Sequence, residues 1–378
     1  MEKCAACGGA IGDSILFEWK NMPEGAQIIP QKDELEMDKP IPLKLVQCKF
    51  CGLVQLSVEP VFYYKDAIRV GNLTKTMVDL RRKEFEELLA KYGMKGKKVI
   101  EIGCSTGEYV ALMKEYGIDA YGLEHSEDSC TIARERNLNI FRGYLKDENE
   151  RICEFLFDGF VCYNFLEHQP EPVHFLRGIY NNLNDNAYGL ITVPSFDYMV
   201  VNSGLYEVIR DHLVYYTEDT LRAVLAQSGF EVVDISTINH DTLSAIVKKK
   251  RMFDLNGQKQ VYKRLIDSIN KIVKDLKLQG KKIAVWGASH QCFTALAETE
   301  LGKYVEYIVD SSSVKQGRYS PVTHIPIVDL NYFFSNKADV IIIMAPGYAE
   351  EIKASITKLY GSDVKIGVLF ADKIYMEG

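Results

Sequence analysis

The chain has 378 residues, of which 47% are apolar, and a formal net charge of −7 at pH 7, so it can form two or three globular domains with buried cores. This acidic balance argues against a nucleic-acid partner, because binding to a phosphate backbone requires a surplus of Lys and Arg. No apolar run approaches the roughly 18 residues of a membrane span, and cysteines stand where a signal peptide would be hydrophobic. We therefore expect a cytoplasmic protein with neither a membrane nor a nucleic-acid partner.

Four of the nine cysteines form two close pairs near the N-terminus, Cys4 with Cys7 and Cys48 with Cys51. A disulfide framework is not expected in a reducing compartment. Each C-x-x-C pair is followed by Gly, as in zinc knuckles, and four thiolates suit tetrahedral zinc. The spacing therefore predicts a structural Zn²⁺ site in a small module over residues 1–75, too short to be stabilised by its own core. An iron–sulfur centre and unmetallated thiols are the alternatives.

The rest of the chain reads mainly as alternating strands and helices. Short strands are expected within 15–30 and 41–48, and a helix within 74–93. Strands over 97–103, 120–126, 157–168 and 188–195 then alternate with helices over 108–117, 130–137 and 173–183, and two β segments follow at 230–238 and 241–250. Such alternation predicts an α/β fold with a doubly wound parallel sheet, over residues 76–250. A linker helix at 261–280 leads into a second, Rossmann-like α/β domain, so that the third domain spans 251–378.

A glycine-bearing turn follows the first strand of the larger sheet, in VIEIGCSTG over residues 99–107. Glycines let the backbone approach a ligand closely, and the following helix offers free N–H groups. Glu124 ends the next strand, where a carboxylate can accept both hydroxyls of a ribose. The spacing E-x-G-x-x-x-G resembles motif I of class I S-adenosylmethionine-dependent methyltransferases, which implies that cofactor. The residues assigned to its pocket are Glu101, Gly103, Ser105, Gly107, Glu124, His125 and Asn164.

The order of the three segments along the chain shows a resemblance that extends beyond the cofactor motif. The C-terminal unit contains KQGRYSPVTHIPI over residues 315–327 and WGASHQ at its first turn, neither of which is a G-x-G-x-x-G fingerprint. A two-pair cysteine module, a methyltransferase core and this C-terminal stretch together resemble the three-domain zinc-containing sugar C-methyltransferases, over nearly the whole chain. The resemblance implies a nucleotide-linked keto-deoxysugar as the substrate, partly enclosed by the outer domains. Substrate contacts are expected at Tyr63, Tyr64, Lys315, Tyr319, Thr323 and His324.

Two histidines are candidates for the chemistry. Methylation of a carbon beside a ketone needs a base for the α-proton and a donor that steadies the enolate oxygen. His168, in YNFLEHQPEP, follows the fourth strand at the carboxyl edge of the sheet, and His212, in IRDHLVYYT, precedes a helix. Both titrate near neutrality in the absence of neighbours, which suits a base. A purely structural role is the alternative for each.

The family's Tyr-x-Glu-His stretch reads I-R-D-H here, over residues 209–212. His212 is retained, Asp211 is a shortened acid, and Ile209 has no hydroxyl group. This departure leaves open which sugar is used and whether a nearby tyrosine, Tyr206, Tyr215 or Tyr216, has become the proton donor. The predicted catalytic set is His212, His168, Asp211 and Tyr216.

These features favour an S-adenosylmethionine-dependent C-methyltransferase. Methyl transfer to oxygen or nitrogen of another small polar metabolite is one alternative, in which His212 would deprotonate a hydroxyl. A non-enzymatic zinc scaffold with a decayed methyltransferase core is the other, and the intact acidic residues and glycines of the cofactor motif argue against it.

Overall fold

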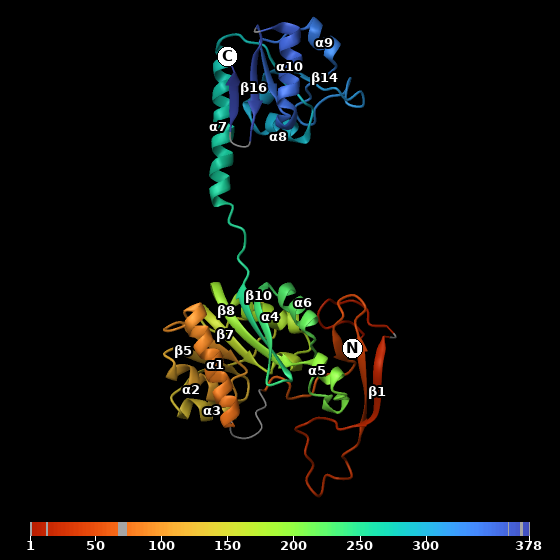
Figure 1. Ribbon diagram of the computed structural model, residues 1–378, viewed down its shortest axis with the longest axis vertical. Coiled ribbons are helices and arrows are strands. Elements are labelled where there is room, and N and C mark those ends of the chain that lie inside the picture. Colours follow the sequence, from red (N-terminus) through yellow and green to blue (C-terminus); the bar gives the residue numbers. More distant parts are fainter. Residues whose placement is uncertain (1, 13, 67–73, 362, 371–372, 378) are drawn as a thin grey trace. The chain divides into compact units, whose positions relative to one another are not determined.

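The computed structural model describes residues 2–12, 14–66, 74–361, 363–370 and 373–377. The chain forms two compact units, Met1–Met252 and Phe253–Gly378, which Figure 1 draws in red to green and in green to blue. The first unit contains both the segment predicted as a cysteine module and the segment predicted as the cofactor-binding domain. Where the boundary between those two lies stays a prediction.

A small antiparallel sheet forms the N-terminal part of the first unit. Its strands are β1 (Ile15–Met22), β2 (Ile41–Gln47), β3 (Val54–Leu56) and β9 (Val214–Tyr215), in the order β1-β2-β3-β9. The fourth strand, β9, comes from a segment that lies far along the chain from the other three. The small sheet is therefore completed by the segment that follows His212.

The second sheet of this unit has seven strands in the order β10-β11-β8-β7-β4-β5-β6. Strands β4 to β8 pair in parallel, whereas β11 pairs antiparallel with β8 and with β10, so the doubly wound sheet ends in a hairpin on one side. The strands are β4 (Lys98–Ile102), β5 (Asp119–Glu124), β6 (Asn139–Arg142), β7 (Phe157–Tyr163), β8 (Leu183–Pro194), β10 (Phe230–Ile238) and β11 (Thr242–Lys249). The helices are α1 (Lys75–Tyr92), α2 (Glu108–Glu115), α3 (Glu127–Glu135), α4 (Pro172–Asn181), α5 (Phe196–Val201) and α6 (Glu218–Gln227).

Alternation along the strands builds a core on each face of this sheet. In β4, Val99 faces the core that α1, α2 and α3 cover, whereas Ile100 and Ile102 face the core that α4 and α6 cover. The second core also contains the buried Cys4 and Cys48, so the cysteine module and the large sheet share buried apolar surface.

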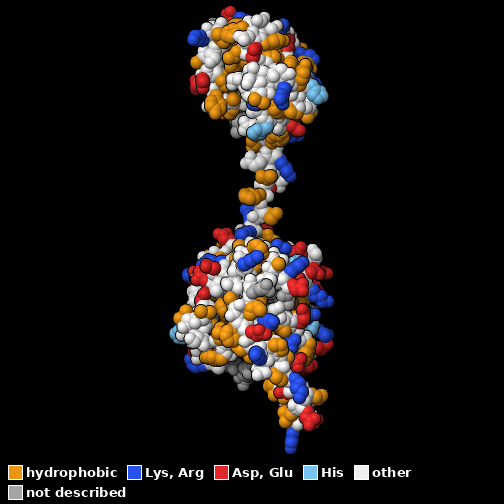
Figure 2. Space-filling view, turned by 90° about the vertical axis from the view of Figure 1, so that its right-hand side faces the viewer, with side chains coloured by type: hydrophobic (Ala, Val, Ile, Leu, Met, Phe, Trp, Pro, Cys, Tyr) orange, Lys and Arg blue, Asp and Glu red, His pale blue; other side chains and the backbone are white. Residues whose placement is uncertain are grey.

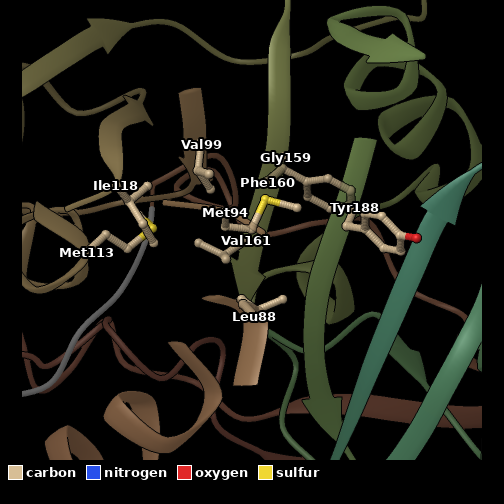
Figure 3. Close-up of a pocket in the computed structure, with 9 residues that line it drawn as sticks. All are labelled: Leu88, Met94, Val99, Met113, Ile118, Gly159, Phe160, Val161 and Tyr188. Carbon is tan, nitrogen blue, oxygen red and sulfur yellow. The ribbon is translucent and has the colours of Figure 1, made fainter. Parts of the chain in front are cut away.

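A small cavity lies within the first of these cores (Figure 3). It measures about 10 Å³ and is lined by apolar side chains such as Leu88, Met94 and Val99. That volume is at the lower limit for one water molecule, and a lining without polar partners would not hold one. The cavity also lies toward the amino ends of β4 and β7, away from the edge where ligands bind parallel sheets.

The second unit begins with the long helix α7 (Asn256–Leu278), and no described helix is both long and apolar enough to span a membrane. Its sheet has the order β14-β13-β12-β15-β16-β17, parallel except for β17. The strands are β12 (Ile283–Trp286), β13 (Val305–Val309), β14 (Ile327–Val328), β15 (Val340–Ile343), β16 (Lys365–Leu369) and β17 (Ile374–Glu377), and the helices are α8 (His290–Glu298), α9 (Leu330–Ser335) and α10 (Ala349–Tyr360). This is the predicted Rossmann-like arrangement.

Basic and acidic side chains are interspersed over the face of the first unit that Figure 2 shows.

Candidate functional site

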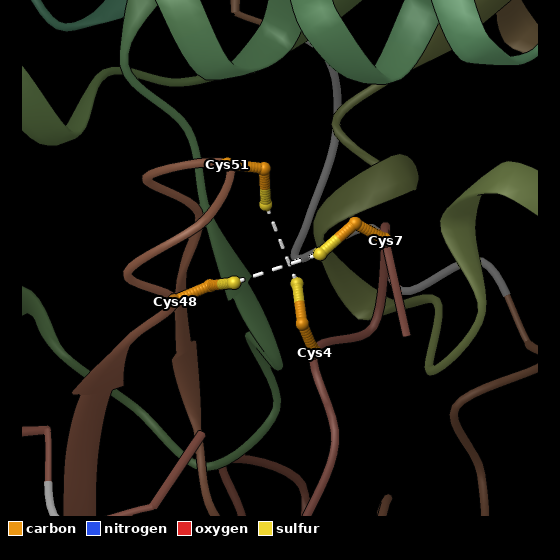
Figure 4. Close-up of side chains that lie close together, drawn as sticks. All are labelled: Cys4, Cys7, Cys48 and Cys51. Carbon is orange, nitrogen blue, oxygen red and sulfur yellow. Dashed lines mark hydrogen bonds between the residues drawn. The ribbon is translucent and has the colours of Figure 1, made fainter. Parts of the chain in front are cut away.

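The four N-terminal cysteines converge on one point (Figure 4). The Sγ atoms of Cys4 and Cys51 lie 3.5 Å apart and those of Cys7 and Cys48 lie 3.6 Å apart. Four thiolates around tetrahedral Zn²⁺, with Zn–S bonds of about 2.3 Å, would place their sulfurs about 3.8 Å apart. The N–H groups of Phe50 and Cys51 point at the Cys48 sulfur, as in a zinc knuckle. The residue types and their spacing fit a closed four-thiolate metal site.

This cysteine cluster is directly connected to the segment that follows His212. Strand β3 begins three residues after Cys51 and pairs with β9 through Val54 with Tyr215. The N–H of Leu56 also donates to the carbonyl of Leu213 at 2.9 Å. The cysteine module therefore fixes the backbone next to His212.

The glycine turn after β4 adopts the geometry that a cofactor-binding turn needs. Gly103 has φ = 73° and Gly107 has φ = 81°, conformations that side chains with a Cβ rarely adopt. A Cβ on Gly107 would lie 2.6 Å from Leu138. Glu124 accepts the N–H of Ser105 and that of Ser126, each at 2.8 Å, so its carboxylate fixes the turn and the start of α3. The N–H of His125 also faces this carboxylate, which has about four lone-pair sites and so can still accept a ribose hydroxyl.

The other residues predicted for the cofactor pocket lie around the same edge. Glu101 is buried within β4. His125 Nδ1 lies 2.6 Å from Asp66 Oδ1 at the surface. Asn164 has φ = 46° and its side-chain oxygen accepts the hydroxyl of Thr192 at 2.7 Å. The Phe165 ring packs against Gly103, at 3.0 Å from the position of a Cβ there. The turn, the acid at the end of β5 and the two glycines thus fit S-adenosylmethionine.

His168 and His212 lie side by side, with ring centroids 4.9 Å apart and planes nearly perpendicular. His168 Nδ1 donates to the main-chain carbonyl of Asp211 at 2.8 Å, which leaves its Nε2 as an acceptor. Burial and then the neighbouring His168 lower the pKa of His212 to about 3, and no hydrogen-bond partner of its Nδ1 lies among the described residues. At neutral pH both imidazoles are uncharged, and both can accept a proton.

The side chain of Asp211 makes its hydrogen bonds to groups other than the histidines. Burial lowers the pKa of His168, and the charge of Asp211 opposes that lowering. Asp211 Oδ1 accepts the hydroxyl of Tyr63 at 2.7 Å and its Oδ2 accepts the N–H of Ala26 at 2.8 Å. The neighbouring Arg210 donates to the carbonyl of Glu24 at 2.8 Å. Residues 209–212 are thus held by the N-terminal module.

Glu167, which sequence reasoning missed, lies in the same cluster. It is 1% exposed, and its Oε2 has no hydrogen-bond partner among the described residues. One oxygen of Glu167 and one ring nitrogen each of His168 and His212 lie within 4.8 Å of one another. Burial raises the pKa of Glu167 to about 8. The only signal in the sequence was its place beside His168 after a buried strand.

The predicted tyrosines differ in their environments. Tyr216 is fully buried, and its hydroxyl lacks a hydrogen-bond partner in the described part of the chain. Tyr64 packs edge-on against Tyr144, with ring centroids 5.9 Å apart. The hydroxyl of Tyr215 contacts the backbone of Ile209, and Tyr206 is 82% exposed.

The remaining predicted substrate residues lie in the second unit. Lys315 lines a cavity of about 620 Å³ at the carboxyl ends of β12, β13 and β15, where its Nζ lies 3.3 Å from Asp310 Oδ2. Thr323 Oγ1 lies 2.7 Å from Ser320 Oγ. Tyr319 is 66% exposed, and His324 has φ = 53°. Of this group only Lys315 lines the cavity.

Two family models match successive parts of the chain. Residues 77–235 match the model of a methyltransferase domain, and residues 239–368 match the model of a C-methyltransferase C-terminal domain.

Relatives match the whole chain or its centre. C-methyltransferase NovU of Streptomyces niveus is 21% identical over 93% of this chain and 91% of that protein. A ubiquinone biosynthesis O-methyltransferase of Pseudomonas aeruginosa is 26% identical over 43% of this chain and 77% of that protein. Among solved structures, magnesium protoporphyrin IX methyltransferase of Synechocystis PCC 6803 with bound SAH is 14% identical, with a TM-score of 0.38 over 48% of this chain and 90% of that one.

Proposed function

The chain is an S-adenosylmethionine-dependent methyltransferase with a C-methyltransferase C-terminal domain, and on this basis we propose that it methylates a carbon beside the carbonyl of a nucleotide-linked keto sugar. The observation that carries the proposal is the half-buried pair of uncharged imidazoles, His168 and His212, at the carboxyl edge of the cofactor-binding sheet. A neutral imidazole with a free acceptor nitrogen is the form that removes a proton.

His212 is the proposed base, because its Nδ1 has no hydrogen-bond partner among the described residues. It removes the proton from the carbon next to the carbonyl, and His168, whose Nε2 is an acceptor, orients the substrate. S-adenosylmethionine, when bound, supplies an electrophilic methyl group on a sulfonium centre. Burial excludes water and keeps both rings uncharged until the proton is transferred. Tyr216 is the alternative proton-transferring group from the predicted set.

The proposed cofactor contacts are the ones predicted from the sequence. The backbone at Gly103, Ser105 and Gly107 would pass along the cofactor, and Glu124 would accept its ribose hydroxyls. Glu101, His125 and Asn164 would border the same pocket. Their side chains lie at or near the turn after β4 and the ends of β5 and β7.

We further propose that the four cysteines bind Zn²⁺ with a structural role. The Sγ separations of 3.5 and 3.6 Å support this, because a closed four-thiolate set leaves no open position for a substrate. Since β3 pairs with β9, the metal would stabilise the backbone beside His212.

The substrate is proposed to contact Tyr63 and Tyr64 in the first unit. Lys315, Tyr319, Thr323 and His324 are the proposed contacts from the second unit. Lys315 is the best supported of these four, because it supplies a cation at a cavity large enough for a nucleotide.

Proton exchange tests this function without the methyl donor. The enzyme is incubated in deuterium oxide with nucleoside-diphosphate 4-keto-6-deoxyhexoses, starting with the thymidine derivative, and deuterium uptake is read by mass spectrometry. The proposal predicts uptake at the carbon beside the carbonyl, abolished in His212→Ala. Methyl transfer to one of these sugars without any exchange at carbon would instead favour an oxygen acceptor.

A further inference from the structure

We propose that Glu167 is a further catalytic residue, which enters the reaction as a neutral carboxylic acid and donates a hydrogen bond to the substrate's carbonyl oxygen while His212 removes the α-proton. The inference rests on the proposed function. Enolate formation needs a hydrogen-bond donor that stabilises the developing oxyanion. The two histidines act as acceptors, so neither supplies this donor, and the proposal assigns the role to Glu167.

The position of Glu167 is fixed on both sides. It is the central residue of a single 3-10 turn, Leu166–His168, which follows β7. Its carbonyl accepts the N–H of Leu213 at 2.8 Å, which ties this turn to the segment that carries His212. Glu167 and His212 therefore face each other from two separate but hydrogen-bonded segments.

The two side chains are close enough to act on neighbouring atoms of one substrate. A carboxylate oxygen of Glu167 and a ring nitrogen of His212 lie within 4.8 Å of each other, and Glu167 Oε2 and His212 Nδ1 both lack partners in the described part of the chain. Contacts of about 2.7 to 3.0 Å on each side can span up to about 6 Å between two such groups. A keto oxygen next to Glu167 would thus present its α-carbon to His212.

The surroundings favour the neutral acid. The titratable groups that face Glu167 are Cys162 from β7, Tyr215 and Tyr216 from β9 and its C-terminal flank, and the two histidines. None of the five is cationic at neutral pH, because burial keeps the histidines uncharged. No charge in this set compensates a carboxylate, and an uncompensated buried carboxylate takes up a proton. An acid kept neutral by an apolar site is an effective donor to an enolate oxygen.

The step balances without a further reagent. The C–H bonding pair becomes the C=C bond of the enolate, the proton passes to the His212 ring, and the carbonyl π pair moves to the oxygen that Glu167 hydrogen-bonds. The enolate carbon then takes the methyl group, the S–CH₃ bonding pair stays on sulfur, and the carbonyl re-forms. Glu167 keeps its proton throughout, and His212 releases its proton to water.

Two variants separate this role from packing or from ion binding. In Glu167→Ala the donor is lost, and kcat should fall about 100- to 1000-fold, the cost of one oxyanion donor, with S-adenosylhomocysteine affinity unchanged. Glu167→Gln keeps the shape and an N–H donor, so its kcat at pH 7 should stay within about tenfold of wild type. Glu171→Gln, at an exposed position nearby, is the matched control.

The pH profile is the decisive readout. The kcat of wild type is measured on whichever nucleoside-diphosphate 4-keto-6-deoxyhexose it methylates, and it should fall above about pH 8 as Glu167 ionises. This decrease at alkaline pH should be absent in Glu167→Gln. A limb that persists in Glu167→Gln, or a Glu167→Gln variant as impaired as Glu167→Ala, would overturn the proposal.

Measurements of metal content and of proton exchange test the remaining interpretations. Glu167→Gln should keep the metal content of wild type, and loss of one equivalent with this substitution would overturn the proposal in favour of an ion held by Glu167 and the histidines. Wild-type protein that neither exchanges nor methylates any probe would refute the proposed function itself. An active wild type with an unaltered pH profile in Glu167→Gln would refute the role of Glu167 alone.

Discussion

The Glu167 carboxyl group should make the stability of the first unit depend on pH, and Glu167→Gln should remove that dependence. Burial raises the pKa of Glu167 to about 8, from 4.5 in an exposed carboxyl group. Below about pH 4.5 both folded and unfolded chains carry the proton, so the group does not favour either. Between about pH 4.5 and 8 the unfolded chain loses the proton while the folded chain keeps it, so the stability falls as the pH rises.

The size of the effect follows from the shift. One pKa unit corresponds to about 1.36 kcal/mol, so a change from 4.5 to about 8 corresponds to about 5 kcal/mol. Local opening that admits water to the carboxylate limits this loss of stability. We therefore expect wild type to lose about 2 to 5 kcal/mol of stability over this pH range. The unfolding free energy of Glu167→Gln minus that of wild type should therefore be larger at about pH 8.5 than at about pH 5, by about 2 to 5 kcal/mol.

Urea unfolding of the first unit measures this directly. The chain has two tryptophans, Trp19 in β1 and Trp286 in β12, so in a Trp286→Phe background fluorescence reports the first unit alone. Glu171→Gln should show a difference from wild type that is flat with pH to within about 0.5 kcal/mol. If the stability difference between Glu167→Gln and wild type is equally independent of pH between about pH 5 and 8.5, the assignment of a neutral buried acid is refuted.

Three other outcomes are expected. Cys48→Ser should lose the metal and unfold the N-terminal module, and less than about half an equivalent of zinc in carefully purified wild-type protein would contradict the metal assignment. Gly103→Val should block close backbone approach to the cofactor, and Glu124→Ala should weaken S-adenosylhomocysteine binding by about 1 to 3 kcal/mol. Calorimetric titration measures both effects, and unchanged affinity in both variants would exclude this pocket. His212→Ala should lower turnover about 100-fold or more without a change in cofactor affinity, and His168→Ala should be milder; full turnover in His212→Ala would move the base elsewhere.

Local patterns were sufficient for the fold class and for the cofactor motif. The strand and helix alternation gave the doubly wound sheet, because each such strand carries its own buried apolar run. The turn from Gly103 to Gly107 was predictable because a positive φ and close approach restrict the residue type. The resemblance to C-methyltransferases, drawn from the order of the parts, is confirmed by the matched family models and the full-length relative.

Long-range pairing was not predictable in this way. The strand β9 has two residues and joins β3 across about 160 positions of sequence, so no local periodicity marks it. Asp211 was selected beside His212, yet its side chain binds Tyr63 and Ala26, which only the folded chain brings together. Glu167 was missed because an acid after a strand usually faces water, whereas this one is enclosed by residues from β7 and from β9 and its C-terminal flank.

The most direct test of the proposed function is the position of the transferred methyl group. The enzyme is incubated with S-adenosylmethionine carrying a ¹³C-labelled methyl group and with the nucleoside-diphosphate 4-keto-6-deoxyhexoses, and the product is examined by NMR. The proposal predicts a labelled methyl group bonded to the carbon next to the carbonyl, seen by one-bond coupling in a product made from ¹³C-labelled sugar. A label attached to oxygen or nitrogen would contradict methylation at carbon.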